Sequence, residues 1–249
     1  MRVLICTDSF KHSLTAYEAG RALAEGLALA DRRFSVSLLP LADGGEGTVR
    51  ALVDATGGTI REARVHDPLM REINAQYGLL GDKKTAVIEM AAASGIELLR
   101  EEERNPFFTT SYGTGELIRA AMDSGCNKII LGIGGSATID GGAGLLSALG
   151  ARFYDKNDHT LLPTGEKLND ICHIDLSQLD SRLQEITIEI ASDVDNPLTG
   201  LNGAAYIYGP QKGARDGDLK ILDHNLAAYA SLLEKSTSAT DLAVKPGTG

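Results

Sequence analysis

Cysteine is scarce in this sequence: 249 residues contain three, with no C-x-x-C spacing. That count excludes a disulfide framework and a cysteine zinc site, and it indicates reduced, structural thiols. No apolar run approaches the length that spans a membrane. The opening run is too short for a signal peptide and is broken by Asp8, so we expect a cytoplasmic protein.

Positive charge is also in short supply, because 24 lysines and arginines face 34 acidic residues, for a formal net charge of -10. Nucleic acid and anionic membranes are therefore poor partners, whereas a small anionic substrate needs only a locally basic site. Neither a Walker A sequence nor the protein-kinase signature set occurs, so another loop must bind any ATP. The five histidines lack metal-ligand spacing.

Glycine is plentiful, with 28 residues, and a hydrophobic content of 43% is typical of a soluble α/β protein. Between residues 59 and 90, three β-type stretches follow one another with only turns between them, which predicts antiparallel pairing. We predict strands near 3–7, 34–39, 62–65, 73–80, 85–88, 129–131, 151–154 and a buried one at 186–191, and helices near 14–30, 46–55, 116–123, 143–149 and 218–234.

The most informative stretch runs from Lys128 to Ala143, where an apolar strand leads into a loop of five glycines, a serine and a threonine. Backbone N–H groups of glycine at a helix N-terminus can approach a phosphate without a Cβ in the way. We therefore predict that this loop binds the phosphates of a nucleotide, through Gly132, Gly134, Gly135, Ser136, Ala137 and Thr138.

The same loop also matches a relaxed dinucleotide fingerprint, with Asp155 about twenty residues further on. An NAD(P)-dependent oxidoreductase is therefore a competing hypothesis. It requires a helix directly after Gly132, which would place Gly141 and Gly142 inside that helix at a cost of about 1 kcal/mol each.

Four aspartates follow predicted strand ends, the edge at which open α/β sheets bind ligands: Asp8, Asp43, Asp193 and Asp195. In extended backbone Asp193 and Asp195 point the same way, so they are candidate ligands of a hydrated Mg²⁺ ion. A turn before Pro197 is the structural alternative. Lys11 and Lys212 are candidate anion ligands, with surface lysines as the alternative.

Six motifs, taken in order along the whole chain, resemble the bacterial glycerate kinase family. They are Asp8-Ser-Phe-Lys11, Ala42-Asp-Gly-Gly-Glu-Gly-Thr48, Ile88-Glu-Met-Ala-Ala-Ala-Ser-Gly-Ile-Glu-Leu98, Thr110-Ser-Tyr-Gly-Thr-Gly-Glu-Leu-Ile118, Gly132-Ile-Gly-Gly-Ser-Ala-Thr138 and Gly209-Pro-Gln-Lys-Gly-Ala214. The resemblance implies transfer of the γ-phosphoryl group of ATP to a hydroxyl of D-glycerate with Mg²⁺, giving 2-phosphoglycerate.

The resemblance also implies two unlike α/β domains around a cleft. We expect a Rossmann- or flavodoxin-like domain with a parallel sheet to begin in residues 1–62, and a mixed domain with antiparallel strands in residues 63–249. From residue type and position, we assign Asp193, Asp195, Lys11 and Asp8 to catalysis, Lys212 to the nucleotide, and Ser9, Lys11, Asp43, Gly44 and Gly45 to glycerate.

Two departures from the family pattern matter. Ile139 stands where the pattern has asparagine, which removes a polar side chain that we expect beside the phosphate loop. The pattern also continues beyond Gly249, so a third hypothesis is an inactive N-terminal portion of a kinase. We then expect no measurable kinase activity from residues 1–249, and an exposed apolar patch or a partner chain, such as a homo-oligomer, beside residues 3–30.

Overall fold

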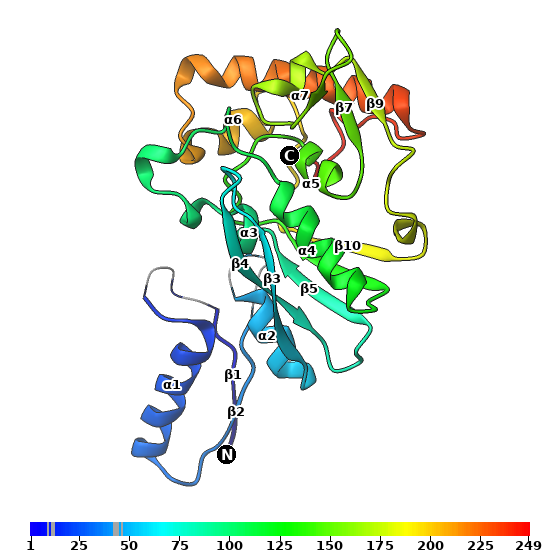
Figure 1. The fold of residues 1–249 in the computed structure, drawn as a ribbon. Helices are drawn as coiled ribbons and strands as arrows, with labels where there is room; N and C mark the ends of the chain where they lie inside the picture. Colours follow the sequence, from blue (N-terminus) through cyan, green and yellow to red (C-terminus); the bar gives the residue numbers. More distant parts are fainter. Residues whose placement is uncertain (9, 11–12, 42–44, 46) are drawn as a thin grey trace.

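The computed structural model describes residues 1–8, 10, 13–41, 45 and 47–249. Within these residues, the strands form sheets of two, five and three members. Figure 1 shows the two-stranded sheet and α1 at one end of the molecule, and β7, β9 and α7 at the other. The predicted mixed α/β class, with parallel and antiparallel strands, is confirmed.

The strands are β1 (Arg2–Ile5), β2 (Ser35–Leu38), β3 (Thr59–His66), β4 (Glu72–Leu79), β5 (Thr85–Glu89), β6 (Lys128–Gly132), β7 (Arg152–Tyr154), β8 (Thr160–Leu161), β9 (His173–Asp175) and β10 (Thr187–Ala191). The α-helices are α1 (Ala16–Ala30), α2 (Thr48–Thr56), α3 (Ala91–Ser94), α4 (Tyr112–Asp123), α5 (Ala143–Ala148), α6 (Ala204–Tyr208) and α7 (Asp216–Ser236). The 3-10 turns are η1 (Ile96–Leu98), η2 (Glu101–Glu103), η3 (Lys167–Asp170), η4 (Ser181–Gln184) and η5 (Pro210–Lys212).

The first unit of the fold is the predicted βα unit. Strands β1 and β2 pair in parallel, and α1 connects them along the sequence. Helix α1 begins at a capping box: the Glu18 amide donates to the Thr15 hydroxyl, and the Glu18 carboxylate accepts from the Thr15 amide at 2.9 Å. These bonds satisfy N–H groups that a helix start leaves without intrahelical partners.

Strand β1 pairs with β2 alone in the described part of the chain, and Leu4 at its centre is 61% exposed. Other large apolar side chains of the unit are also exposed, namely Met1, Phe10, Leu14, Tyr17, Leu23, Leu29, Leu39 and Leu41. Apolar side chains of the unit are therefore exposed, whereas the choice between an open apolar patch beside residues 3–30 and a partner chain that covers it stays a prediction.

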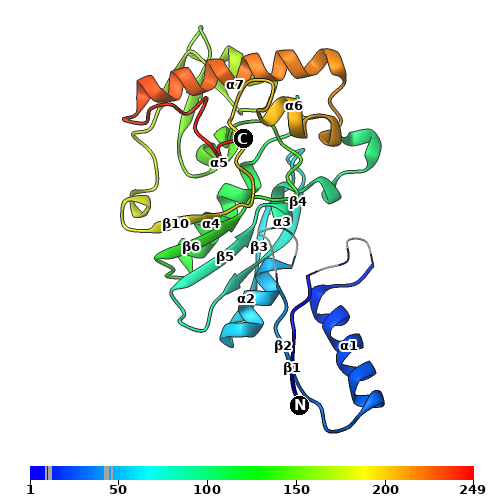
Figure 2. The same ribbon diagram turned by 180° about the vertical axis from the view of Figure 1, so that it is seen from behind.

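The five-stranded sheet has the order β10-β6-β5-β4-β3. Strands β5, β6 and β10 run parallel, while the β3–β4 and β4–β5 pairs are antiparallel, as predicted. Side chains alternate between the faces of β5, so Val87 packs against Val49 and Val53 of α2, whereas Ile88 joins Leu117 of α4 in the main core. Figure 2 shows the sheet from the side that carries α2.

The boundary near residue 62 remains a proposal. Residue 62 lies inside β3, and α2 packs against β3, β4 and β5. Since α2 shares its core with the five-stranded sheet, we propose that the second domain starts before α2.

Strand β10 corrects one prediction. The apolar pattern at 186–191 predicts a buried strand, yet β10 lies at the edge of the sheet and Ile190 is 54% exposed. An apolar run alone does not distinguish a central strand from an edge strand.

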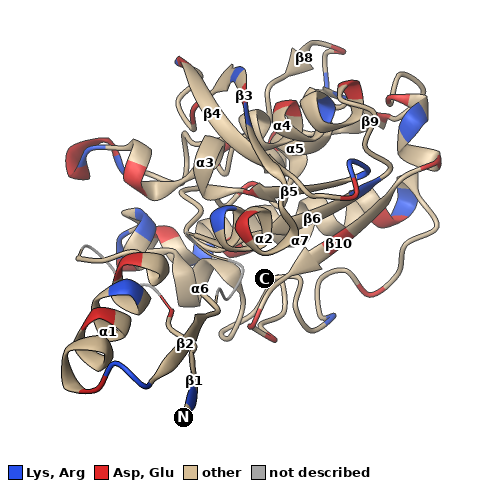
Figure 3. Ribbon diagram, turned by 90° about the horizontal axis from the view of Figure 1, so that it is seen from below, with Lys and Arg blue, Asp and Glu red and all other residues tan. Residues whose placement is uncertain are grey.

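The three-stranded sheet, in the order β8-β7-β9, packs with α5, α6 and α7 around a second core. Phe153 of β7 and Tyr229 of α7 are among its largest buried side chains. Figure 3 shows acidic and basic residues interspersed over the surface elements, including α1. None of the helices in the described part combines the length and apolar character that crossing a bilayer requires.

Candidate functional site

Three parallel strands of the central sheet end together. Glu89 of β5 pairs with Gly132 of β6, and Gly132 pairs with Ala191 of β10. The segments that follow these strands therefore leave the sheet together at the carboxyl ends of the strands, where open α/β sheets bind ligands. The glycine loop and the Asp193–Asp195 segment both start there.

The exposed part of the glycine loop offers free backbone donors. Gly134 and Gly135 are exposed, and Gly135 has φ +71, a conformation that favours glycine. The N–H groups of Gly134, Gly135 and Ser136 donate to no acceptor in the described part of the chain. The loop is nevertheless held in place, because Ile96 N–H donates to the Gly135 carbonyl at 2.9 Å. Such fixed, unpaired amides suit phosphate oxygens.

Lys212 reaches this loop from a distant part of the sequence. Its Nζ atom donates to Ser136 Oγ at 2.8 Å and to the Thr138 carbonyl at 2.7 Å, and the residue is 8% exposed. Burial lowers the pKa of Lys212 to about 8, partly opposed by the negative charge of Asp140. The structure thus brings the predicted lysine to the predicted loop.

Two glycines fix the backbone on either side of Lys212. A Cβ on Gly209 would lie 2.2 Å from the Ala205 carbonyl oxygen, and a Cβ on Gly213 would lie 2.0 Å from that of Arg104. Gly213 also has φ +97. Only glycine fits both positions, which explains the Gly209-Pro-Gln-Lys-Gly213 pattern around the lysine.

Asp140 is a buried residue of the site that the sequence reasoning missed. Its carboxylate accepts from Ser111 N at 2.7 Å and Ser111 Oγ at 2.8 Å, and from the amides of Gly142 at 3.1 Å and Gly144 at 3.2 Å. Burial raises the pKa of Asp140, and these hydrogen bonds oppose the rise. An aspartate just before Gly-Gly-Ala at a helix start is the available signal.

Asp140 corrects one part of the phosphate prediction. Two amides at the start of α5, those of the N-cap Gly142 and of Gly144, already donate to this carboxylate. A phosphate at the N-terminus of α5 would therefore compete with the protein's own anion. The free amides at Gly134 to Ser136 are the donors that remain.

Ile139 also differs from expectation. Its side chain is 3% exposed and belongs to the core that contains Leu198 and Leu222. The position therefore faces an apolar core instead of the phosphate loop, and the missing asparagine takes no polar group away from the loop's exposed side.

The geometry does not fit the dinucleotide hypothesis. Helix α5 begins at Ala143, well after β6 ends at Gly132, so no helix opens at the first glycine. Asp155 lies in the turn between β7 and β8, where it accepts from the amides of Asn157 and His159. A dinucleotide fold needs a helix at the first glycine. It also needs the acidic residue to follow a strand parallel to β6 in the same sheet, whereas β7 belongs to the separate three-stranded sheet, with antiparallel partners.

Asp193 and Asp195 follow β10 and are both exposed. Burial raises the pKa of Tyr208 and the charge of Asp193 adds to the rise, while the Tyr208 hydroxyl donates to Asn196 Oδ1 at 2.6 Å. No group of three or more acidic, histidine or cysteine side chains suited to a metal occurs in the described residues. Their role as magnesium ligands therefore remains a prediction.

Four predicted residues, Ser9, Lys11, Asp43 and Gly44, lie outside the described residues. Asp8 is exposed just after β1. Gly45 leads into α2, and its carbonyl accepts from the Thr48 hydroxyl at 2.8 Å. The Val49 amide donates to Glu89 Oε1 at 2.7 Å, so the start of α2 lies at the end of β5. The start of α2 therefore lies at the same end of the sheet as the glycine loop.

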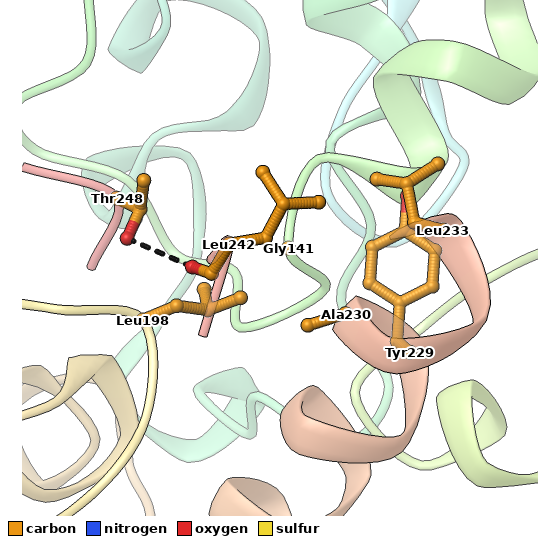
Figure 4. Close-up of a pocket in the computed structure, with 7 residues that line it drawn as sticks. All are labelled: Gly141, Leu198, Tyr229, Ala230, Leu233, Leu242 and Thr248. Atoms are coloured by element: carbon orange, nitrogen blue, oxygen red, sulfur yellow. Dashed lines mark hydrogen bonds between the residues drawn. The ribbon is translucent and has the colours of Figure 1, made fainter. Parts of the chain in front are cut away.

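A separate apolar cavity of about 200 Å³ adjoins the glycine loop at Gly141. Its lining residues, shown in Figure 4, are Gly141, Leu198, Tyr229, Ala230, Leu233, Leu242 and Thr248. It contains neither Lys212 nor Ser136, and it has no cationic side chain. A phosphate therefore has no counter-charge in this cavity, which we do not assign to the nucleotide.

Comparisons with known proteins identify the family of the chain. Residues 3–249 match the glycerate kinase family. The chain is 50% identical over 240 residues to the glycerate kinase of Bacillus subtilis and 49% identical over 249 residues to the glycerate 2-kinase of Escherichia coli. These matches cover 96% and 100% of this chain, but 63% and 65% of the relatives, so the chain spans less than two thirds of their length.

A solved structure agrees as well. The crystal structure of a putative glycerate kinase 2 from Salmonella typhimurium matches with a TM-score of 0.90 and 47% identity, over 100% of this chain and 67% of that chain. The family match over nearly the whole chain establishes that the chain belongs to the glycerate kinase family.

Proposed function

We propose that this protein acts as a glycerate kinase, which transfers the γ-phosphoryl group of ATP to a hydroxyl of D-glycerate and yields 2-phosphoglycerate and ADP. The observation that carries the proposal is the contact of Lys212 with Ser136 and Thr138, inside a glycine loop with free amides. The family match and the name of the Escherichia coli relative, glycerate 2-kinase, support the reaction and its product.

The nucleotide phosphates bind at the exposed part of the glycine loop. Phosphoryl transfer depends mainly on positioning and on neutralising charge, which the Lys212 ammonium group and the amides of Gly134 to Ser136 provide. Ser136 connects the lysine to the amides. Its own amide is one of the free donors, and its hydroxyl accepts a hydrogen bond from Lys212. The same interactions hold the triphosphate in one orientation toward the acceptor.

Asp193 and Asp195 would hold Mg²⁺. This ion usually keeps several waters and binds one or two carboxylates together with substrate phosphates, so an exposed pair at the sheet edge fits its ligand preference. The ion supplies charge neutralisation at the phosphates when bound. One carboxylate of the pair would also accept the proton of the attacking hydroxyl.

Glycerate would bind to the segments that follow β1 and β2. We assign its binding to Ser9, Lys11, Asp43, Gly44 and Gly45, with Lys11 and Asp8 acting at the reacting hydroxyl. The hydrogen bond from the Val49 amide of α2 to Glu89 of β5 supports this arrangement, because it places the start of α2, shortly after Gly45, at the same end of the sheet as the glycine loop. We further propose that the reaction takes place in the cytoplasm.

Thermal shift and turnover together test the proposal. MgATP and D-glycerate should each raise the unfolding midpoint, because ligands that bind only the folded state stabilise it, whereas NADH should not. Incubation with both substrates should yield ADP and 2-phosphoglycerate, identified by ³¹P NMR. Binding without turnover would favour the alternative of an inactive portion of a kinase. Stabilisation by NADH alone would contradict the proposal.

A further inference from the structure

Arg104 carries a buried donor that has no acceptor. Its Nε atom is buried and has no hydrogen-bond partner, and its guanidinium forms no ion pair in the described part of the chain. A buried N–H of a charged group without a partner is costly, and such groups in native proteins call for an explanation, such as a ligand.

The neighbouring acidic residues do not pair with Arg104. Three glutamates, Glu101 to Glu103, precede it, yet Glu102 pairs with Arg100 at 3.1 Å. Glu103 pairs with Arg100 and with Arg71, at 2.9 Å in each case. Local ion pairing therefore involves Arg71 and Arg100, and these three glutamates leave Arg104 without an ion pair. Figure 3 shows this mixed acidic and basic segment projecting beside α3.

The backbone of Arg104 is fixed next to Lys212. Its carbonyl oxygen lies so close to Gly213 that a Cβ on Gly213 would approach it to 2.0 Å. Further along the same segment, the Thr109 hydroxyl donates to the Ala137 carbonyl at 2.9 Å. The segment from 104 to 109 therefore runs from the residue after Lys212 to the glycine loop.

These observations place the backbone of a second cationic residue beside the residue that follows Lys212, and the two cations differ. The charge of Lys212 is partly balanced by Asp140, whereas no carboxylate among the described residues pairs with Arg104. An arginine fork matches two oxygens of one anion, and phosphate oxygens are the anions that the free amides of the loop also suit. Resting on the proposed function, we propose that the Arg104 guanidinium binds phosphate oxygens of the nucleotide at the glycine loop.

The test is calorimetric titration of the 249-residue chain with MgATP, inorganic tripolyphosphate and D-glycerate. Arg104→Met should weaken MgATP and tripolyphosphate by about tenfold or more, because it removes charge-assisted hydrogen bonds, and should leave D-glycerate within about twofold. Arg104→Lys should recover part of the loss. The matched control is Arg61→Met, which removes an exposed arginine of β3 and should change none of the affinities.

A second measurement separates this role from a structural one. Because Arg104→Met removes a buried unpaired N–H, the unfolding midpoint without ligand should stay unchanged or rise. A lower midpoint with unchanged MgATP affinity, or a loss confined to D-glycerate, would overturn the inference. Absence of MgATP binding to the unmodified chain would overturn the proposed function together with it.

Discussion

The Nζ atom of Lys212 lies 2.8 Å from Ser136 Oγ, although 76 residues separate the two in the sequence. This contact joins η5 to the glycine loop and places a buried cation beside free backbone amides. Two distant sequence motifs thereby meet, and we propose that they form one anion site. The predictions below test its parts separately.

Replacing Asp140 should destabilise the fold. In Asp140→Asn, the amide nitrogen must face a backbone donor, because Oδ2 accepts from Ser111 and Gly144 while Oδ1 accepts from Gly142. We expect a loss of about 1–3 kcal/mol in the free energy of unfolding, measured by urea denaturation. The exposed Asp158→Asn is the control and should change little. Equal stability of the two variants would contradict the role of Asp140.

Gly135→Val should weaken MgATP by about tenfold or more and D-glycerate much less, in calorimetric titration. The substituted residue would have to adopt φ +71, and its Cβ would approach Ala91 Cβ to 3.3 Å at the exposed loop. Gly125→Val is the matched control, since Gly125 also has positive φ but no atom within 4 Å. An equal loss for both ligands would instead indicate that the loop misfolds.

Asp193→Asn should lower kcat by on the order of 10²-fold in the turnover assay, the range for a general base. It should also reduce the gain in ATP affinity that Mg²⁺ provides, which calorimetry measures even without turnover. The unfolding midpoint should move little, because Asp193 is exposed. Asp241→Asn, another exposed aspartate, is the control. An unchanged magnesium dependence would remove Asp193 from the site.

The exposed face of β1 should drive association of the chain. Leu4 is 61% exposed on a strand that pairs with one other strand among the described residues, and unpaired apolar edges favour contacts between chains. Leu4→Thr should weaken self-association by about tenfold, measured by analytical ultracentrifugation over a range of concentrations. Leu201→Thr removes a leucine elsewhere that is even more exposed, at 77%, and should have no effect. A chain that is monomeric at all concentrations would refute this prediction.

Local patterns predicted much of the fold. Periodicity located the central strands and the long helices, and turn spacing indicated the antiparallel β3–β5 region. Strands β8 and β9 were missed, because two or three residues carry too little periodic signal. The exposure of Ile190 was missed because edge position depends on strand order, which is a property of the whole sheet.

The site was predictable where one segment carries the chemistry. The glycine loop and Lys212 each have a local signature of glycines around polar residues. Asp140 was missed because its main partner, Ser111, lies 29 residues away, and a single sequence does not show that pairing. Ile139 was misjudged because the direction of a loop side chain depends on tertiary packing.

Titration of MgATP into the unmodified chain and into Lys212→Met, at pH 7 and pH 9.5, tests the central claim most directly. With a pKa of about 8, Lys212 is charged below that pH and neutral above it, so affinity should fall by about tenfold or more as the pH rises. Lys212→Met should bind weakly at both pH values, while the exposed Lys220→Met should behave like the unmodified chain. Tight, pH-independent binding by Lys212→Met would contradict the claim that Lys212 and the glycine loop form the nucleotide site.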